Sequence, residues 1–146
     1  MMQNLRLVPW PQSHVIAIMV KTGGVFMSDR LNPGETLFHN DRRESPNGRF
    51  IVVMQPDGNL VLYRHDHEPG DRHIPLWATD TAGTDVNRAV MQLDGNLVLY
   101  HVNNTPAWDS STFGEGIFLA VQDDGNLVLY KPIVPVWATN TAGNWG

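Results

Sequence analysis

The chain has 146 residues, with 10 Lys and Arg against 15 Asp and Glu, which gives a net charge of −5. This length fits one domain, or one domain with an additional arm. Charged residues make up only 17% of the chain and no run of Lys and Arg occurs, so the electrostatic attraction that dominates nucleic-acid binding is not expected. The longest apolar run, at 15–20, is far shorter than the roughly 20 residues of a membrane-spanning helix.

Cysteine is absent, which excludes disulfides, thiol nucleophiles, zinc fingers and iron–sulfur clusters. The first six residues do not look like a secretory signal, because the apolar stretch is short and follows Pro9 and Pro11. The sequence therefore favours a cytoplasmic location or leaderless secretion. Residues 1–28 are interpreted as an N-terminal extension that adds a strand or serves as a docking arm.

Internal repeats dominate the rest of the chain. The string Asp-Gly-Asn-Leu-Val-Leu-Tyr occurs three times without change, at residues 57–63, 94–100 and 124–130. A Gln stands two positions before each copy, and these Gln residues are spaced by 37 and then 30 residues. The three units therefore have a period of roughly thirty residues, in the range of repeat architectures.

Each string is followed by a tryptophan, at Trp77, Trp108 and Trp137. The first unit is longer than the others, and we interpret residues 64–75, which include several His, Asp, Pro and Gly, as an inserted loop. The repeated leucines and tryptophans are the natural filling of a core shared by three units, none of which can close a core alone.

Each unit predicts β structure. Asp-Gly is a strong hairpin-turn signal, and an apolar stretch precedes it in every copy, at 50–54, 89–91 and 117–121. The residues after the turn alternate with a period of two, so Leu60 and Leu62 are expected to face the core. Asn59, Val61 and Tyr63 then lie together on the opposite face. Gly and Pro recur too often for long helices.

The polar face of each unit offers two amides, a carboxylate, a phenol and a small apolar side chain. Sugar hydroxyls both donate and accept hydrogen bonds, so a sugar site needs donors and acceptors interleaved in this way. A plainer interpretation is that Asp and Asn only shape the turn and Tyr only favours a strand. A turn does not require Gln two positions earlier or Tyr six positions after the Asp, so the threefold repetition favours binding, although shared ancestry also preserves repeats.

The pattern Gln-x-Asp-x-Asn-x-Val-x-Tyr resembles the signature of the bulb-type mannose-binding lectins, the monocot or snowdrop-type family. The resemblance runs from about residue 29 to the C-terminus and includes Trp-Ala-Thr-Asn-Thr at 137–141. It implies an all-β domain at 29–146 with the β-prism II fold: three four-stranded antiparallel sheets with pseudo-threefold symmetry. In this family the tryptophans pack on the axis.

The resemblance also implies a mannose site in each unit, where Asp and Asn hold O2, Gln holds O3, Tyr reaches O4 and Val packs on the ring. The first carbohydrate-binding site is then Gln55, Asp57, Asn59, Val61 and Tyr63. The second is Gln92, Asp94, Asn96, Val98 and Tyr100. The third is Gln122, Asp124, Asn126, Val128 and Tyr130. None of these positions departs from the pattern.

We therefore expect a non-catalytic lectin that binds terminal mannose of high-mannose glycans or glycoproteins multivalently, as a homodimer or higher homo-oligomer. No cofactor, nucleic acid or membrane insertion is expected. No nucleophile–base pattern points to an enzyme. His65, His67 and His73 cluster in the inserted loop and could bind a transition metal. A loop rich in Pro, Gly, Asp and Arg is usually solvated surface, so no metal ligand is assigned.

Two other functions remain open. In one, the domain is a structural or assembly module whose repeats survive by descent, docked onto a larger complex through residues 1–28. In the other, the chain is an antibacterial lectin-like protein. Inhibition by free mannose distinguishes a lectin from a docking module.

Overall fold

The computed structural model describes residues 28–67, 69–132 and 134–143. The N-terminal extension expected at 1–28, as an extra strand or docking arm, lies outside this range except for Ser28. The described residues form the following strands: β1 (Arg30–Leu31), β2 (Thr36–Phe38), β3 (Arg42–Glu44), β4 (Phe50–Met54), β5 (Leu60–Asp66), β6 (Arg72–Ala78), β7 (Val86–Met91), β8 (Leu97–His101), β9 (Pro106–Asp109), β10 (Phe118–Val121), β11 (Leu127–Lys131) and β12 (Val134–Ala138).

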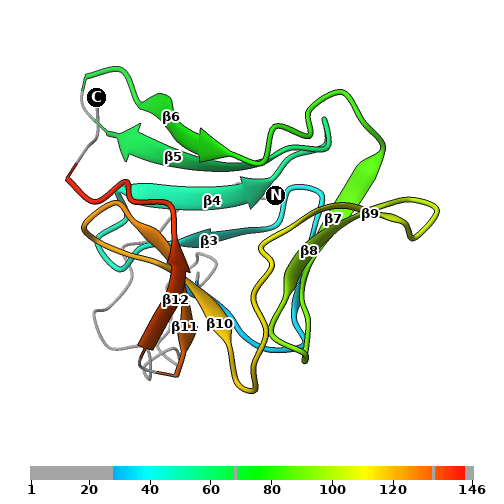
Figure 1. The fold of residues 1–146 in the computed structure, drawn as a ribbon. Helices are drawn as coiled ribbons and strands as arrows, with labels where there is room; N and C mark the ends of the chain where they lie inside the picture. Colours follow the sequence, from blue (N-terminus) through cyan, green and yellow to red (C-terminus); the bar gives the residue numbers. More distant parts are fainter. Residues whose placement is uncertain (1–27, 68, 133, 144–146) are drawn as a thin grey trace.

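The strands form three four-stranded sheets, in the orders β3-β4-β5-β6, β2-β7-β8-β9 and β1-β10-β11-β12, and the paired strands are antiparallel. Figure 1 shows the three sheets arranged around a common centre. The expected all-β architecture of three four-stranded antiparallel sheets is confirmed. Across residues 28–67, 69–132 and 134–143 there is no helix long and apolar enough to cross a membrane.

The short strands β1, β2 and β3 each join a different sheet. β1 pairs with β10, β2 with β7 and β3 with β4. The segment 30–44 therefore completes all three sheets in turn, and each repeat supplies only three of its sheet's four strands. The threefold arrangement is closed by long-range pairing, which explains why no repeat is an independent unit.

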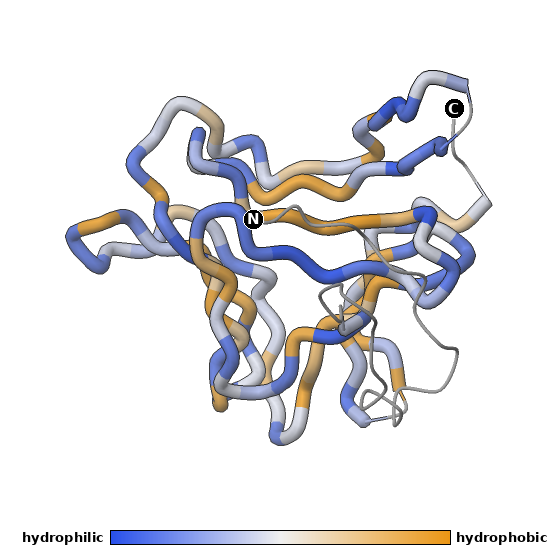
Figure 2. Tube along the Cα trace, turned by 180° about the vertical axis from the view of Figure 1, so that it is seen from behind, coloured by the Kyte–Doolittle hydropathy of each residue, from blue (hydrophilic) through white to orange (hydrophobic). Residues whose placement is uncertain are grey.

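The core is made by the inward faces of the middle strands. Leu60, Leu62 and Phe50 are fully buried in the first sheet, and the corresponding leucines of the other repeats are buried in the same cluster: Leu97, Leu99, Leu127 and Leu129. Figure 2 shows hydrophobic residues along β4, beside the hydrophilic β3. The predicted inward placement of these leucines is confirmed.

The three tryptophans meet where the outer strands converge. Trp77, Trp108 and Trp137 pack edge to face, with ring centroids 5.6–6.2 Å apart. Each stands opposite an inward leucine of its repeat, as in the pair of Leu62 with Trp77. Aromatic rings favour such edge-to-face geometry, and the rings close one side of the core.

A bulge recurs in each outer strand. The register shifts just after the inward leucine, and the next tyrosine then stands opposite a proline two residues before the tryptophan. These prolines are Pro75, Pro106 and Pro135. Proline cannot donate to a sheet, so it is confined to edge strands and bulges, and β6, β9 and β12 each lie at one edge of their sheet.

The prediction of an inserted loop at 64–75 is wrong in part. β5 and β6 each have seven residues, and they pair as far as Asp66 with Arg72. The additional residues therefore extend a hairpin, since the strand pairing continues through His65 and His73. Composition alone suggested a loop because Gly, Pro and Asp cluster there.

Candidate functional site

The functional site is built on a tight turn that precedes β5, β8 and β11. In the first repeat the N–H of Gln55 donates to the carbonyl of Asn59 (2.9 Å), and the N–H of Gly58 donates to the carbonyl of Gln55 (3.0 Å). The same two bonds occur in the other repeats. The glycines have φ of +95°, +92° and +87°, a backbone conformation that side chains disfavour.

The backbones of neighbouring segments lie very close to two of these glycines. A Cβ on Gly58 would lie 2.8 Å from the carbonyl oxygen of Thr84, and one on Gly95 would lie 2.5 Å from the backbone of Gly114. Glycine is therefore required at these turns for two reasons, backbone conformation and space.

Three side chains of each repeat form one hydrogen-bonded chain. In the first repeat the Tyr63 hydroxyl donates to Gln55 Oε1, and Gln55 Nε2 donates to both Asp57 carboxylate oxygens at 3.2 Å. The Asn59 N–H also donates to Asp57 Oδ1 at 3.0 Å. The equivalent groups of the second and third repeats make the same bonds. Tyr, Gln and Asp therefore hold one another in a fixed order.

The Asn side chain is oriented from beneath. Asn59 Oδ1 accepts from the Thr79 hydroxyl (3.2 Å) and from the N–H of Thr81 (3.1 Å). With the oxygen held, the amide NH₂ is turned away from these partners and is available as a donor. Asn96 is held in the same way by Ser110 and Thr112.

The third Asn follows the same scheme. Asn126 Oδ1 accepts from the hydroxyl of Thr139 and the N–H of Thr141. Sequence analysis missed these supporting residues. Their signal is a hydroxyl two and four positions after each tryptophan, and the second loop, Thr112-Phe113-Gly114, is equivalent to the Thr-Ala-Gly loops of the other repeats.

A glycine in the loop after the outer strand forms a backbone hydrogen bond to each turn. The N–H of Gly83 donates to the carbonyl of Asp57, Gly114 to that of Asp94 and Gly143 to that of Asp124, at 2.8–2.9 Å. The backbone position of each Asp therefore depends on a segment outside the repeated string.

The valines complete the set. Val61, Val98 and Val128 are 2–3% exposed, yet they are not part of the central core cluster. They lie on the opposite face of the strand from the core leucines and form an apolar floor beside the polar groups. The structure thus brings the five predicted residues of every repeat to one turn and the strand that follows it.

The surroundings of the tyrosines differ. Tyr63 and His73 pack edge to face, with ring centroids 5.9 Å apart. The guanidinium carbon of Arg88 lies 4.9 Å from the centroid of the Tyr100 ring. Tyr130 stacks with Phe118, with ring centroids 5.7 Å apart. Beside the third turn is a surface cavity of about 430 Å³, which Gln122 and Tyr130 help to line.

Two of the site residues have shifted pKa values. The pKa of Asp94 is lowered, because its carboxylate accepts from the backbone N–H of Asn96 and from the Gln92 amide. The pKa of the Tyr63 hydroxyl is raised, first by burial and then by the nearby Asp57 charge. At neutral pH each group is in the form that its hydrogen bonds require: an accepting carboxylate and a donating phenol.

This geometry defines a class of protein, a β-prism with three polar turns that interleave donors and acceptors around an apolar patch. Comparison with known proteins supports that description. A mannose-specific lectin of Aloe arborescens is 41% identical over 99 residues, which are 64% of this chain and 82% of the relative. One from Narcissus tazetta is 42% identical over 108 residues, 74% of this chain but 46% of the relative.

The matched region is thus about half the length of the Narcissus relatives, 46% and 59%. Among solved structures, the mannose-specific agglutinin from snowdrop (Galanthus nivalis) bulbs, complexed with methyl-α-D-mannoside, matches with a TM-score of 0.62 and 38% identity. The match covers 78% of this chain and 97% of that one. No family model matches the chain.

The identity and the coverage of the Aloe relative, with the shared three-sheet architecture, establish the family. The chain belongs to the bulb-type mannose-binding lectins, and its fold is the β-prism II.

Proposed function

We propose that the protein is a mannose-specific lectin with three sites per chain, one at each repeated turn. The observation that carries the proposal is that all three turns present the same hydrogen-bonded set, with Asn oriented by hydroxyls from below. The relatives are named mannose-specific lectins, and the snowdrop protein was solved with a mannoside.

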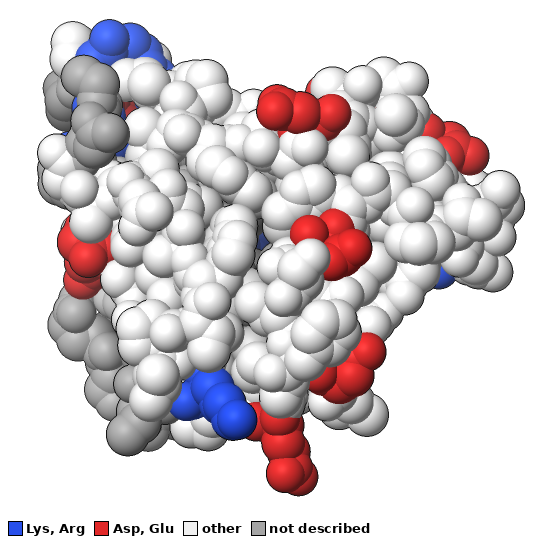
Figure 3. All heavy atoms as spheres, viewed as in Figure 1, with Lys and Arg blue, Asp and Glu red and all other residues white. Residues whose placement is uncertain are grey.

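Each site offers the groups that a mannose ring requires. The Asp carboxylate accepts, the Asn NH₂ donates, and Gln and Tyr do both. In the proposed arrangement Asp and Asn bind O2, Gln binds O3, Tyr binds O4, and Val contacts the ring carbons. On the face drawn in Figure 3, Asp and Glu are scattered among uncharged residues, which suits an uncharged ligand.

The proposal assigns the Asp of each turn to binding and not to catalysis. The Asp of each turn accepts from the Asn backbone N–H and from the Gln amide, and its remaining acceptor positions are assigned to the sugar O2. A single carboxylate held in this way serves as an acceptor and does not form the pair that glycoside hydrolysis uses. Binding without catalysis is therefore the function that the geometry favours.

Multivalency supplies the affinity in this proposal. A small, water-competed sugar contact is expected to be of millimolar strength, about 4 kcal/mol. Linked sites can raise the overall affinity about 10²–10⁴-fold without a new contact. Three sites per chain, increased by formation of a homodimer or higher homo-oligomer, suit clustered terminal mannose on high-mannose glycans or glycoproteins.

The test is retention of the full chain on immobilised mannan. We expect retention that methyl α-mannoside releases and methyl α-galactoside does not. A folded sample that passes straight through would contradict the proposal and favour the assembly module, with residues 1–28 as the place to look for a partner.

Variants assign the sites. Replacing Asp57, Asp94 and Asp124 together by Ala is expected to abolish retention with the β-sheet circular-dichroism spectrum preserved, because each turn keeps its glycine. The matched control is Asp85→Ala, an exposed Asp outside the turns that pairs with His101, and it should be retained like the original chain. Full retention of the folded triple variant would show that the sites lie elsewhere.

A further inference from the structure

The end of the β5–β6 hairpin has a side-chain cluster with no counterpart in the other two repeats. Three of the chain's six His lie within residues 65–73. His65 and His67 are two apart on the first strand and its continuation, so they project to the same side. Asp71, with φ of +52°, leads the chain back into β6.

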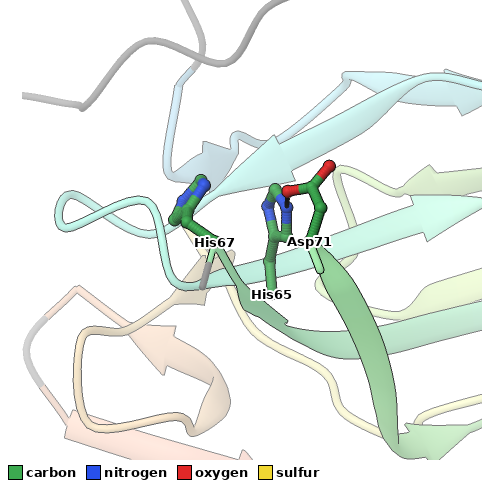
Figure 4. A group of neighbouring side chains, drawn as sticks. All are labelled: His65, His67 and Asp71. Atoms are coloured by element: carbon green, nitrogen blue, oxygen red, sulfur yellow. Dashed lines mark hydrogen bonds and ion pairs between the residues drawn. The ribbon is translucent and has the colours of Figure 1, made fainter. Parts of the chain in front are cut away.

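These side chains converge. Potential ligand atoms of His65, His67 and Asp71 all lie within 4.8 Å of one another. His65 Nε2 lies 2.7 Å from Asp71 Oδ1, and the rings of His65 and His67 are 4.1 Å apart. Figure 4 shows the carboxylate beside the His65 ring, with His67 next to it.

The cluster at the β5–β6 hairpin is more than a His–Asp ion pair, as comparison with such a pair in the second sheet shows. In the second sheet His101 Nδ1 meets Asp85 Oδ1 at 2.6 Å, and among the described residues no third His, Asp or Glu joins that pair as a potential ligand. At the β5–β6 hairpin a second imidazole joins the pair. The His65 side chain is 7% exposed, and within the described part of the chain its Nδ1 has no hydrogen-bond partner.

We propose that His65, His67 and Asp71 form a binding site for a divalent transition-metal ion of the zinc type. Two imidazoles and one carboxylate are common zinc ligands, at about 2.0–2.2 Å from the ion, with water in a fourth position. Tetrahedral ligands at that distance lie about 3.4 Å apart. His67 and Asp71 are exposed, so small side-chain rotations bring the three groups to that spacing.

The ligand types determine the selectivity. Imidazole suits Zn²⁺, Cu²⁺ and Ni²⁺, whereas Ca²⁺ and Mg²⁺ prefer sets made of oxygen atoms. The proposed ion joins the ends of β5 and β6 across the connecting turn, and so stabilises the longest hairpin. This proposal replaces the sequence-based expectation of no metal ligand. The reason for the change is Asp71, a third potential ligand that the hairpin brings beside two histidines.

The cluster adjoins the first carbohydrate site without being part of it. His73, which stacks on His65 at 4.2 Å, also contacts Tyr63. His67 and Asp71 have no such contact with the turn residues in the described structure. They can therefore be changed without removing a group that the proposed sugar site uses.

The experiment is calorimetric titration of the chelator-treated full chain with ZnCl₂ at neutral pH. His67→Ala and Asp71→Asn are each expected to weaken Zn²⁺ binding at least about tenfold, because removal of even an outer-shell partner of a metal ligand costs about 10–100-fold in affinity. His101→Ala, which removes a histidine from a His–Asp pair that lacks a third ligand, is the matched control and should bind like the original chain. CaCl₂ and MgCl₂ should give no heat of binding at this site.

Three results would overturn the proposal: no Zn²⁺ binding by the original chain, unchanged binding by a folded His67→Ala variant, or equal weakening by His101→Ala. Mannan retention separates the two proposals, because the His67→Ala variant should bind mannan normally. Loss of zinc with mannan binding preserved supports an independent metal site.

Discussion

The repeated turns have the same geometry in all three sheets, whereas the hairpin ends differ in length. At the turns, the Gln-to-Asp hydrogen bonds are 3.1–3.3 Å in every repeat. At the other end of the hairpins, β5 and β6 have seven residues each, whereas β8 and β9 have five and four. The two ends of the middle strand of a sheet, the turn before it and the hairpin end after it, are therefore under different constraints.

The reason is how many segments contact each end. A turn is bonded to its own strand and to the loop that follows the outer strand, through groups such as Thr81 and Gly83. A hairpin end is held mainly by its own two strands, so it can change in length and composition. The repeats keep the proposed binding groups, whereas the group beside the tyrosine comes from a different place in each repeat: His73 of β6, Arg88 of β7 or Phe118 of β10.

The largest effect is expected from Gly95→Ala. The new Cβ would meet the Gly114 backbone at 2.5 Å, at a φ of +92°. A left-handed backbone with a side chain costs about 1–2 kcal/mol, and the displaced segment brings the expected loss of unfolding free energy to about 3 kcal/mol. Chemical denaturation measures this loss.

Gly83→Ala is its control. The backbone is again left-handed, with φ of +83°, but nothing lies within 4 Å of a Cβ there. The expected loss of unfolding free energy is only the cost of the left-handed backbone, about 1–2 kcal/mol. Equal losses for the two variants would show that the close contact with Gly114 does not restrain the turn.

A smaller effect is expected from Thr79→Val, which removes the hydroxyl that donates to Asn59 and accepts from the N–H of Leu60. A buried donor left without a partner costs about 1–3 kcal/mol. The released Asn59 should also weaken mannoside binding at the first site, which NMR titration of that site would detect while the other two sites bind as before.

The contrasting change is Thr105→Val, at the end of the β8–β9 hairpin. Its hydroxyl is exposed and donates only to Asn103 Oδ1. Exposed substitutions usually change stability by less than about 0.5 kcal/mol. If Thr105→Val destabilised the protein as much as Thr79→Val, the distinction between turns and hairpin ends would fail.

The smallest effect is expected from pH. The pKa of Asp94 is lowered in the folded state by the Asn96 N–H and the Gln92 amide, so its contribution to stability is complete above the ordinary value of 3.8 and is lost as the pH falls through the lowered pKa. The carboxyl ¹³C shift should titrate below 3.8. Gln92→Ala should move the midpoint upward, and a midpoint above the ordinary value in the original chain would contradict the assignment.

The sequence predicted the parts of the molecule that local pattern controls. Alternation after Asp-Gly placed Leu60 and Leu62 in the core and Val61 and Tyr63 on the other face, because side chains of a strand alternate. The threefold string indicated three equivalent units, and its resemblance to a lectin signature indicated the family. The triplet Pro-x-Trp of each outer strand, which the sequence analysis did not interpret, coincides with an edge-strand bulge in the structure.

Only the tertiary structure decided how the units close and what supports their turns. β1, β2 and β3 join three different sheets, a distribution that no local period records, since strand pairing between distant segments depends on the whole core. Thr79 reaches Asn59 across twenty residues for the same reason. Asp71 meets His65 and His67 because the strands of the first hairpin continue pairing where composition suggested a loop.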